Sequence, residues 1–404
     1  MRNIAAHVTF CKEMKEQEYD FSDIAPYKDS EFHSVMEKLV KEPGFHHVIN
    51  YTMPPEDVPT IFEELLKIDN KYDFQHQMMF PFLEMLAKTT TSGITLGGIK
   101  YYNPSTCYTF ITNHRDIVLD ASFLNLAFLR KGLPTSEVAI GNNLLIFDWI
   151  TDLVRLNKSF IVKRNTGLRE GLLAAKKLSA YIHHCILDKG ESVWIAQREG
   201  RSKDSSDKTQ DSLIKMLAMA GEGGFMDRLK EINLLPISIS YEFDPNDYLK
   251  AREFLLKKRN PEFKKSQRDD LFSMETGLLR FKGKVHFQLT PRINRKLEEI
   301  GEFGDNNRAA HHVGCLVDQA IHRSYQIFEI NYIAFDLLNE TDRFSSKYTT
   351  EKKEEIISYF NSQLDKVDLN DITKEERDYM WQIMLTMYAN PLKNKLKALL
   401  GGIE

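Results

Sequence analysis

Short apolar strands alternate with helical segments between about residues 95 and 295, and this alternation constrains the fold more than any other feature. The strand-like segments are rich in aromatic and β-branched residues, and amphipathic stretches separate them. Strands connected through helical crossovers tend to pair in parallel. The sequence therefore predicts an α/β domain with a partly parallel sheet flanked by helices. The expected strands are 108–112, 137–141, 159–163, 192–196 and 234–242, with a late strand or hairpin over 281–293.

Helical segments lie on both sides of this region. We expect a helical N-terminal region over residues 1–90, the α/β domain over 91–295, and a helical C-terminal region over 296–404. Proline and glycine punctuate the N-terminal helices at Pro43, Gly44, Pro54 and Pro55. The N-terminal amphipathic stretches are 30–42, 55–68 and 75–88.

Composition bounds the class of protein. With 404 residues, 42% of them hydrophobic, the chain can bury a sizeable core. A net charge of -4 gives no global reason to expect a nucleic-acid partner, and none is predicted. The N-terminus is not expected to be a signal peptide, and no window offers the roughly 18 uninterrupted apolar residues of a spanning helix. The four cysteines are scattered without a CxxC pair, which favours reduced thiols in the cytoplasm: Cys11, Cys107, Cys185 and Cys315.

His114 is the leading candidate for a general base, because it stands where a strand gives way to a helix in TNHRDIVLDASFLN (112–125). Two acids follow it. Asp116 is either the helix cap or the partner of the histidine, and Asp120 lies in or just after the first turn. On a regular helix His114 and Asp120 would lie about 120° apart, so they can pair only if His114 lies in the loop.

Two further segments carry charged residues at strand ends. NKSFIVKRN (157–165) ends in Lys163 and Arg164, and cations at the carboxyl end of a strand suit an anionic ligand, although solvated surface is the plainer interpretation. In SVWIAQREGRSKDSSDK (192–208), Gly200 permits a tight turn that presents Glu199 and Arg201 toward one site. A polar surface turn is the alternative there.

Taken in order, the blocks NHRDIVLD, SFIVKR, REGRSKD and LLPISISYE resemble the glycerolipid acyltransferase family over roughly residues 95–295. That family has a His and an Asp with four residues between them, a Phe-Ile block ending in Arg, a Glu-Gly with a nearby Arg, and a Pro-containing strand. Here five residues separate His114 from Asp120. The second block lacks a leading glycine and carries two cations, and the third is one residue shorter than usual.

The resemblance implies a glycerolipid acyltransferase-like fold and an O-acyltransferase. His114, oriented by Asp120 or Asp116, would take the proton from a hydroxyl of 1-acylglycerol 3-phosphate as that hydroxyl attacks an acyl thioester, giving phosphatidic acid. Glycerol 3-phosphate and a lyso-aminolipid are alternative acceptors. The residues expected to bind the substrate phosphate are Lys163, Arg164 and Arg201, and those expected to contact the substrate are Glu199 and Gly200.

The acyl donor implied by the resemblance is acyl carrier protein or coenzyme A, with no cofactor and no metal. The acyl chain needs an apolar slot, for which 78–86 and 144–153 are candidates, with ordinary core as the alternative. Basic residues within 255–268 are candidates to bind anionic headgroups, or form a solvated helical face. We therefore expect a cytoplasmic protein held peripherally at the inner face of the membrane.

Two other classes compete with this interpretation. One is a noncatalytic lipid-binding protein of the same fold. A phosphotransferase is less favoured because the sequence has no GxxxxGK[ST] loop. A metal site is a minor alternative, on ligand-type side chains that share one helix face: His311, Cys315, Asp318 and His322.

Overall fold

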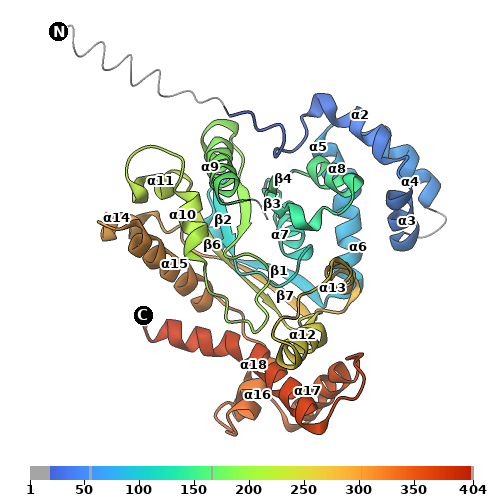
Figure 1. Ribbon diagram of the computed structural model, residues 1–404, viewed down its shortest axis with the longest axis vertical. Coiled ribbons are helices and arrows are strands. Elements are labelled where there is room, and N and C mark those ends of the chain that lie inside the picture. Colours follow the sequence, from blue (N-terminus) through green and yellow to red (C-terminus); the bar gives the residue numbers. More distant parts are fainter. Residues whose placement is uncertain (1–18, 54–56, 165–166, 302, 402–404) are drawn as a thin grey trace.

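A seven-stranded sheet lies at the centre of the protein, seen in a computed structural model that describes residues 19–53, 57–164, 167–301 and 303–401 (Figure 1). The strand order is β1-β7-β6-β2-β5-β3-β4. All neighbouring strands pair in parallel except β6 and β7, which are antiparallel. The predicted α/β fold with a partly parallel sheet is confirmed. The strands are β1 (Gly93–Gly97), β2 (Thr109–Thr112), β3 (Glu137–Gly141), β4 (Ser159–Val162), β5 (Val193–Ala196), β6 (Leu234–Tyr241) and β7 (Lys284–Leu289).

Helices cover both faces of the sheet, and further helices lie before and after the α/β region of the chain (Figure 1). The helices before β2 are α2 (Asp29–Leu39), α3 (Pro43–Thr52), α4 (Val58–Leu65), α5 (Lys71–Asp73), the π-helical η1 (Phe74–Met79), α6 (Phe80–Thr90) and the short η2 (Ile99–Tyr101). Between β2 and β6 come α7 (Leu119–Leu129), η3 (Asn142–Leu144), α8 (Asp148–Leu156), α9 (Leu168–His184), η4 (Cys185–Lys189), α10 (Asp211–Leu217) and α11 (Phe225–Glu231). The remainder are α12 (Asp247–Arg259), α13 (Gln267–Leu279), α14 (Asn294–Ile300), α15 (Asn306–Arg323), α16 (Glu329–Leu338), η5 (Ser345–Lys347), α17 (Thr350–Leu364) and α18 (Lys374–Leu399).

One strand differs from the sequence-based expectations, and one expected helix boundary is observed. Strand β1 was not expected, because GITLG has a glycine at each end and its alternation of apolar and polar residues spans only Ile94 to Leu96. The helix boundary expected at Pro43 and Gly44 is observed: α2 ends at Leu39 and α3 begins at Pro43, whose fixed φ and missing N–H suit a helix N-terminus. Pro54, Pro55 and the N-terminal segment that contains Cys11 lie outside the described residues.

The two faces of the sheet are buried in two different apolar clusters, because successive strand residues point to opposite faces. In β5, Val193 and Ile195 contact the cluster that includes α9, α10 and α15. Trp194 points the other way, into the cluster formed with α6 and α7. Strands buried on both sides read as continuous apolar runs, which is why β5 and β6 stood out in the sequence.

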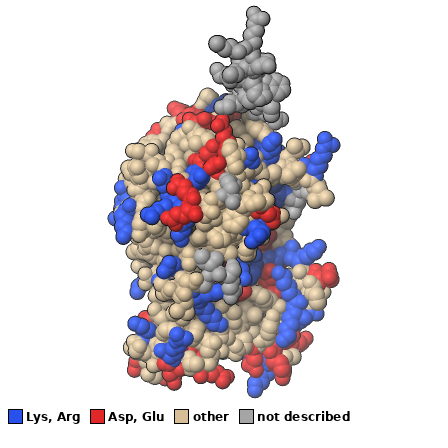
Figure 2. Space-filling model, turned by 90° about the vertical axis from the view of Figure 1, so that its left-hand side faces the viewer, with Lys and Arg blue, Asp and Glu red and all other residues tan. Residues whose placement is uncertain are grey.

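The terminal helices pack on the α/β layers across the boundaries expected at residues 90 and 296. The N-terminal helices share a cluster with Leu156 of α8. The C-terminal helices α16–α18 share another with Tyr248 and Leu255 of α12. On the face turned to the left in Figure 1, acidic and basic side chains are interspersed (Figure 2). Within the described residues, no helix combines the length and apolarity needed to cross a bilayer.

Candidate active site

The loop between β2 and α7 carries His114, and buried polar contacts fix this loop at its start. The side chain of Asn113 donates to the Ile239 carbonyl at 2.9 Å and accepts from the Ile239 N–H at 2.8 Å. Asn113 thereby continues the pairing of β2 with β6 beyond the last strand residue. The backbone then turns, and His114 lies in the loop rather than on the helix.

His114 pairs with Asp120. Its Nδ1 lies 2.8 Å from Oδ2 of Asp120, and the side chains are 13% and 1% exposed respectively. The same oxygen accepts from the backbone N–H of Arg115 at 2.6 Å and of Asp116 at 3.1 Å. The loop therefore wraps around one carboxylate oxygen. With Nδ1 engaged, Nε2 is the nitrogen left to exchange a proton with a ligand.

Asp116 has a different position. Its Oδ1 accepts from the N–H groups of Val118 at 2.9 Å and Leu119 at 2.8 Å, so it caps the start of α7. Burial and the nearby charge of Asp120 raise its pKa. Helix α13 presses against it at Gly277, where a Cβ would come within 2.1 Å of the Asp116 Oδ2. Asp116 is thus a helix cap packed under α13.

Arg115 anchors the same loop to the C-terminal helices. Its buried guanidinium donates to Oδ2 of Asp207 at 2.5 Å, and the hydroxyl of Tyr325 donates to that oxygen at 2.6 Å. Burial lowers the pKa of Arg115, but Asp207 and the other acidic groups around it together outweigh burial and raise the pKa overall. Asn394 of α18 donates to the Ser206 carbonyl at 3.2 Å, so the last long helix also holds the segment around Asp207.

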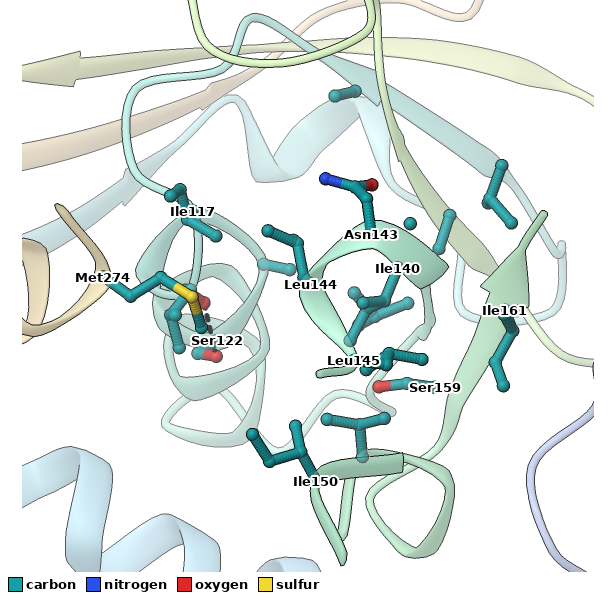
Figure 3. Close-up of a pocket in the computed structure, with 18 of the residues that line it drawn as sticks. Ile117, Ser122, Ile140, Asn143, Leu144, Leu145, Ile150, Ser159, Ile161 and Met274 are labelled. Atoms are coloured by element: carbon teal, nitrogen blue, oxygen red, sulfur yellow. Dashed lines mark hydrogen bonds between the residues drawn. The ribbon is translucent and has the colours of Figure 1, made fainter. Parts of the chain in front are cut away.

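His114 opens into a cavity of about 1340 Å³ whose lining is mainly apolar. Figure 3 shows side chains from α7, β3, β4, α8 and α13 around this space, among them Ile140, Ile150 and Met274. Both apolar segments singled out in the sequence contribute: 78–86 through residues of η1 and α6, and 144–153 through η3 and α8. The cavity is large enough for a long acyl chain.

The predicted phosphate-binding residues Lys163 and Arg164 lie at one side of the cavity, and both are already paired. Lys163 forms an ion pair with Asp23, which Lys177 also contacts at 2.5 Å. Arg164 Nη1 lies 3.2 Å from Oε1 of Glu199. The structure therefore brings Arg164 and Glu199 together, while Lys163 is drawn toward the N-terminal segment.

Gly200 and Arg201 precede a residue that contacts the His114 loop, since the N–H of Ser202 donates to the His114 carbonyl at 3.3 Å. Gly200 has a φ of 66°, the left-handed conformation that glycine adopts without strain. Arg201 is buried and lines the cavity. The amide of Asn246, in the orientation that satisfies both of its neighbours, accepts from Arg201 at 3.0 Å and donates to the Ser273 carbonyl at 3.1 Å. Arg201 is thus a buried cation, fixed by Asn246, at the wall of the cavity that His114 also lines.

The ligand-type residues of α15 contact the segment 207–211, and Cys315 Sγ also lies 3.7 Å from Nε2 of His311. Asp318 accepts from the hydroxyl of Thr209 at 2.5 Å, and His322 contacts the Asp207 carbonyl at 2.9 Å. His311 Nδ1 lies 3.2 Å from Asp211. Among the residues that the structure describes, no group of three or more His, Cys, Asp or Glu side chains is arranged to hold a metal ion.

Sequence reasoning missed several residues that build this site. Asn113 and Arg115 flank His114 and were visible as polar residues beside it, but their partners are 126 and 92 positions away. Lys203 also lines the cavity and was not singled out within its block. For Asn113 and Arg115, the available signal in the sequence was a polar residue on each side of a candidate base.

No family model matches the chain, and no curated protein matches it. Among solved structures, the 1-acyl-sn-glycerophosphate (LPA) acyltransferase PlsC from Thermotoga maritima is similar with 12% sequence identity and a TM-score of 0.31. That match covers 70% of this chain and 94% of the other.

Proposed function

We propose that this protein is an O-acyltransferase that moves a fatty acyl group from a thioester to a hydroxyl of 1-acylglycerol 3-phosphate, forming phosphatidic acid. The observation that carries the proposal is the pairing of His114 with a buried Asp120 at the wall of a large, mainly apolar cavity that Arg201 also lines. A base, an acyl slot and a cation for phosphate are the three parts that this reaction requires. The block order in the sequence supports the same function.

In the proposed reaction, Asp120 holds His114 with its proton on Nδ1, and Nε2 removes the proton from the acceptor hydroxyl. The hydroxyl oxygen forms a bond with the thioester carbonyl carbon, and the C–S bond breaks. The thiolate leaves with the proton that His114 carries, so the imidazole returns to its starting state. Arg201 holds the phosphate and orients the acceptor. The acyl group passes directly from the thioester to the acceptor, and no covalent acyl-enzyme forms.

The test is acyl transfer by the purified protein, followed as lipid product by mass spectrometry. The donors are acyl-coenzyme A and acyl carrier protein, and the acceptors are 1-acylglycerol 3-phosphate, glycerol 3-phosphate and a lyso-aminolipid. We expect turnover that falls by about 10²-fold or more in His114→Ala. Preference for another acceptor would move the assignment to that substrate. Lipid binding without turnover for any pair would favour the noncatalytic alternative.

We further propose that the protein acts in the cytoplasm and attaches peripherally to the inner face of the membrane. Large apolar side chains are exposed on α9 and α13, including Leu172, Leu173 and Phe272. Phe272 also lines the cavity, so an acyl chain has a short path from a bilayer. These side chains offer more for membrane contact than the basic stretch 255–268, part of which is paired elsewhere: Arg259 lies 2.6 Å from Glu376 of α18.

Sedimentation with vesicles of phosphatidylglycerol and phosphatidylcholine tests the attachment. Phe272→Glu removes an exposed aromatic side chain and is expected to weaken vesicle binding about tenfold. Leu187→Glu is the matched control, because Leu187 is also exposed but lies past the other end of α9, and it should bind as the wild type does. Equal binding by all three proteins would contradict this docking face.

A further inference from the structure

Three lysines converge on one glutamate at the cavity wall, in a group that we call the Glu253 cluster: Glu253, Lys203, Lys257 and Lys265. Lys203 Nζ lies 2.9 Å and Lys265 Nζ 3.2 Å from Oε2 of Glu253. Lys257 Nζ lies 2.9 Å from Oε1. Lys203 follows β5, Glu253 and Lys257 belong to α12, and Lys265 stands just before α13. Segments far apart in sequence therefore build one charged site.

The cluster holds more positive than negative charge. Glu253 is buried and supplies one carboxylate, and Asp270 adds a second only at 3.9 Å from Lys265. Burial and the neighbouring charges of Arg201 and Lys265 lower the pKa of Lys203 to about 7, even though Glu253 lies beside it. Burial is the largest of these causes and the two nearby cations add to it, so an anion placed beside Lys203 would stabilise its charged form.

The position of the cluster connects it to the His114 site. Lys203 and Lys257 line the same cavity as His114, as does Arg201, two residues before Lys203. Lys163 and Arg164 line that cavity too, but they are paired with Asp23 and Glu199. The Glu253 cluster is thus a second basic site, built largely from α12 and the loop that follows it.

We propose that the Glu253 cluster is a subsite for a phosphomonoester, in which Lys203 and Lys257 contact the phosphate oxygens and Lys265 adds charge behind them. A phosphomonoester carries a charge of about -1.5 to -2 near pH 7 and presents three strong acceptor oxygens. That charge matches what the cluster lacks. The proposal deepens the acyltransferase assignment, on which it rests for the identity of the substrate, because both the glycerol phosphate acceptor and coenzyme A carry such a group.

Direct binding of inorganic phosphate, measured by isothermal titration calorimetry, tests the subsite without any turnover. We expect the wild type to bind phosphate and Lys203→Gln to bind at least about tenfold more weakly, since a hydrogen bond to a charged group contributes about 1.5–3 kcal/mol. Lys203→Arg keeps the charge and should restore binding. His114→Ala should bind as the wild type does, because His114 is not part of the cluster.

A matched pair of variants separates the cluster from a general effect of losing a lysine. Lys257 is 52% exposed and lies 2.9 Å from the buried Glu253. Lys38 is 58% exposed and lies 2.8 Å from the buried Asp152, which does not line the cavity. Lys257→Gln should weaken phosphate binding about threefold, and Lys38→Gln should leave it unchanged. Absence of phosphate binding in the wild type, or equal binding by Lys203→Gln, would overturn the proposal.

Steady-state kinetics then identify which substrate, the acceptor or the donor, binds its phosphate at the Glu253 cluster. A KM increase in Lys203→Gln for the phosphorylated acceptor alone assigns the subsite to the acceptor. An increase for acyl-coenzyme A, but not for the phosphate-free acyl-pantetheine, assigns it to the donor. If the wild type shows no acyl transfer, the proposed function fails while the phosphate titration still decides the subsite. If transfer occurs and neither KM nor phosphate binding changes, the subsite fails and the acyltransferase assignment stands.

Discussion

Replacing Asp120 with asparagine separates the charge of this side chain from its shape. The carboxylate accepts from His114 and from two backbone N–H groups through one oxygen, so an amide oxygen can keep the backbone contacts. The substitution removes the negative charge that stabilises protonated His114 during proton transfer. In the opposite orientation the amide nitrogen would donate to Nδ1 and the two backbone N–H groups would lose their acceptor; the proton of a neutral imidazole would then be on Nε2, the wrong nitrogen for a base.

The size of the effect follows from the separation of the charges. With Nδ1 and Oδ2 2.8 Å apart, the charge centres lie about 4 Å apart, and at an effective dielectric constant of about 20 their attraction is about 4 kcal/mol. This corresponds to a loss of roughly 10³-fold in kcat. Steady-state acyl transfer with saturating donor and acceptor measures it, and circular dichroism checks that the variant is folded.

Asp116→Asn is the control, since it makes the same change four residues earlier. Its amide oxygen can still cap α7 through Val118 and Leu119, and removal of a buried charge beside Asp120 relieves the repulsion that raises the pKa of Asp116. We expect kcat within about threefold of wild type. A folded Asp120→Asn that keeps more than a tenth of the wild-type kcat, or a large loss in Asp116→Asn, would refute the reasoning.

Two further predictions concern the buried contacts behind the site. Tyr325→Phe leaves Asp207 with one fewer hydrogen-bond donor, so we expect the free energy of unfolding in urea to fall by about 1–3 kcal/mol. We also expect kcat to fall while KM stays unchanged. An unaltered unfolding curve would argue against the contact between Tyr325 and Asp207. Burial raises the pKa of Asp247 to about 6, so the folded protein binds this proton more tightly than the unfolded chain does. The protonated carboxyl therefore contributes stability that is fully present below about pH 4 and is lost as the pH rises through about 6. Asp247→Asn should therefore gain stability relative to wild type between pH 4 and 7, by up to about 3 kcal/mol in urea titrations, and a difference that does not change with pH would contradict this.

The sequence predicted the sheet well where burial alone determines a strand. β5 and β6 are buried on both faces, so their apolar runs are continuous and need no knowledge of the neighbours. β1 escaped notice because its place depends on pairing with β7, nearly 200 residues away, and its own residues are glycine-bounded. A strand specified by its partner leaves little trace in its own sequence.

The candidate site divides in the same way. His114 and Asp120 were found because both lie in one short segment, and helix geometry already required that His114 be off the helix if the two were to pair. Lys203 and Glu253 were not connected, because only the packing of α12 beside the loop after β5 brings them within 2.9 Å. Charge pairs between distant segments depend on tertiary packing, which local patterns do not encode.

The contacts of α18 with the segment around Asp207 also bear on the order of events during biosynthesis. The bond from Asn394 to Ser206 spans 188 positions, and that from Tyr325 to Asp207 spans 118. A nascent chain on the ribosome can form β2, β5 and the His114 turn long before α18 emerges. Contacts of such long range form late in folding, so the Arg115 anchor would be completed only after α18 has been translated. A ribosome stalled before α18 would then carry a folded sheet with an unsecured His114 loop.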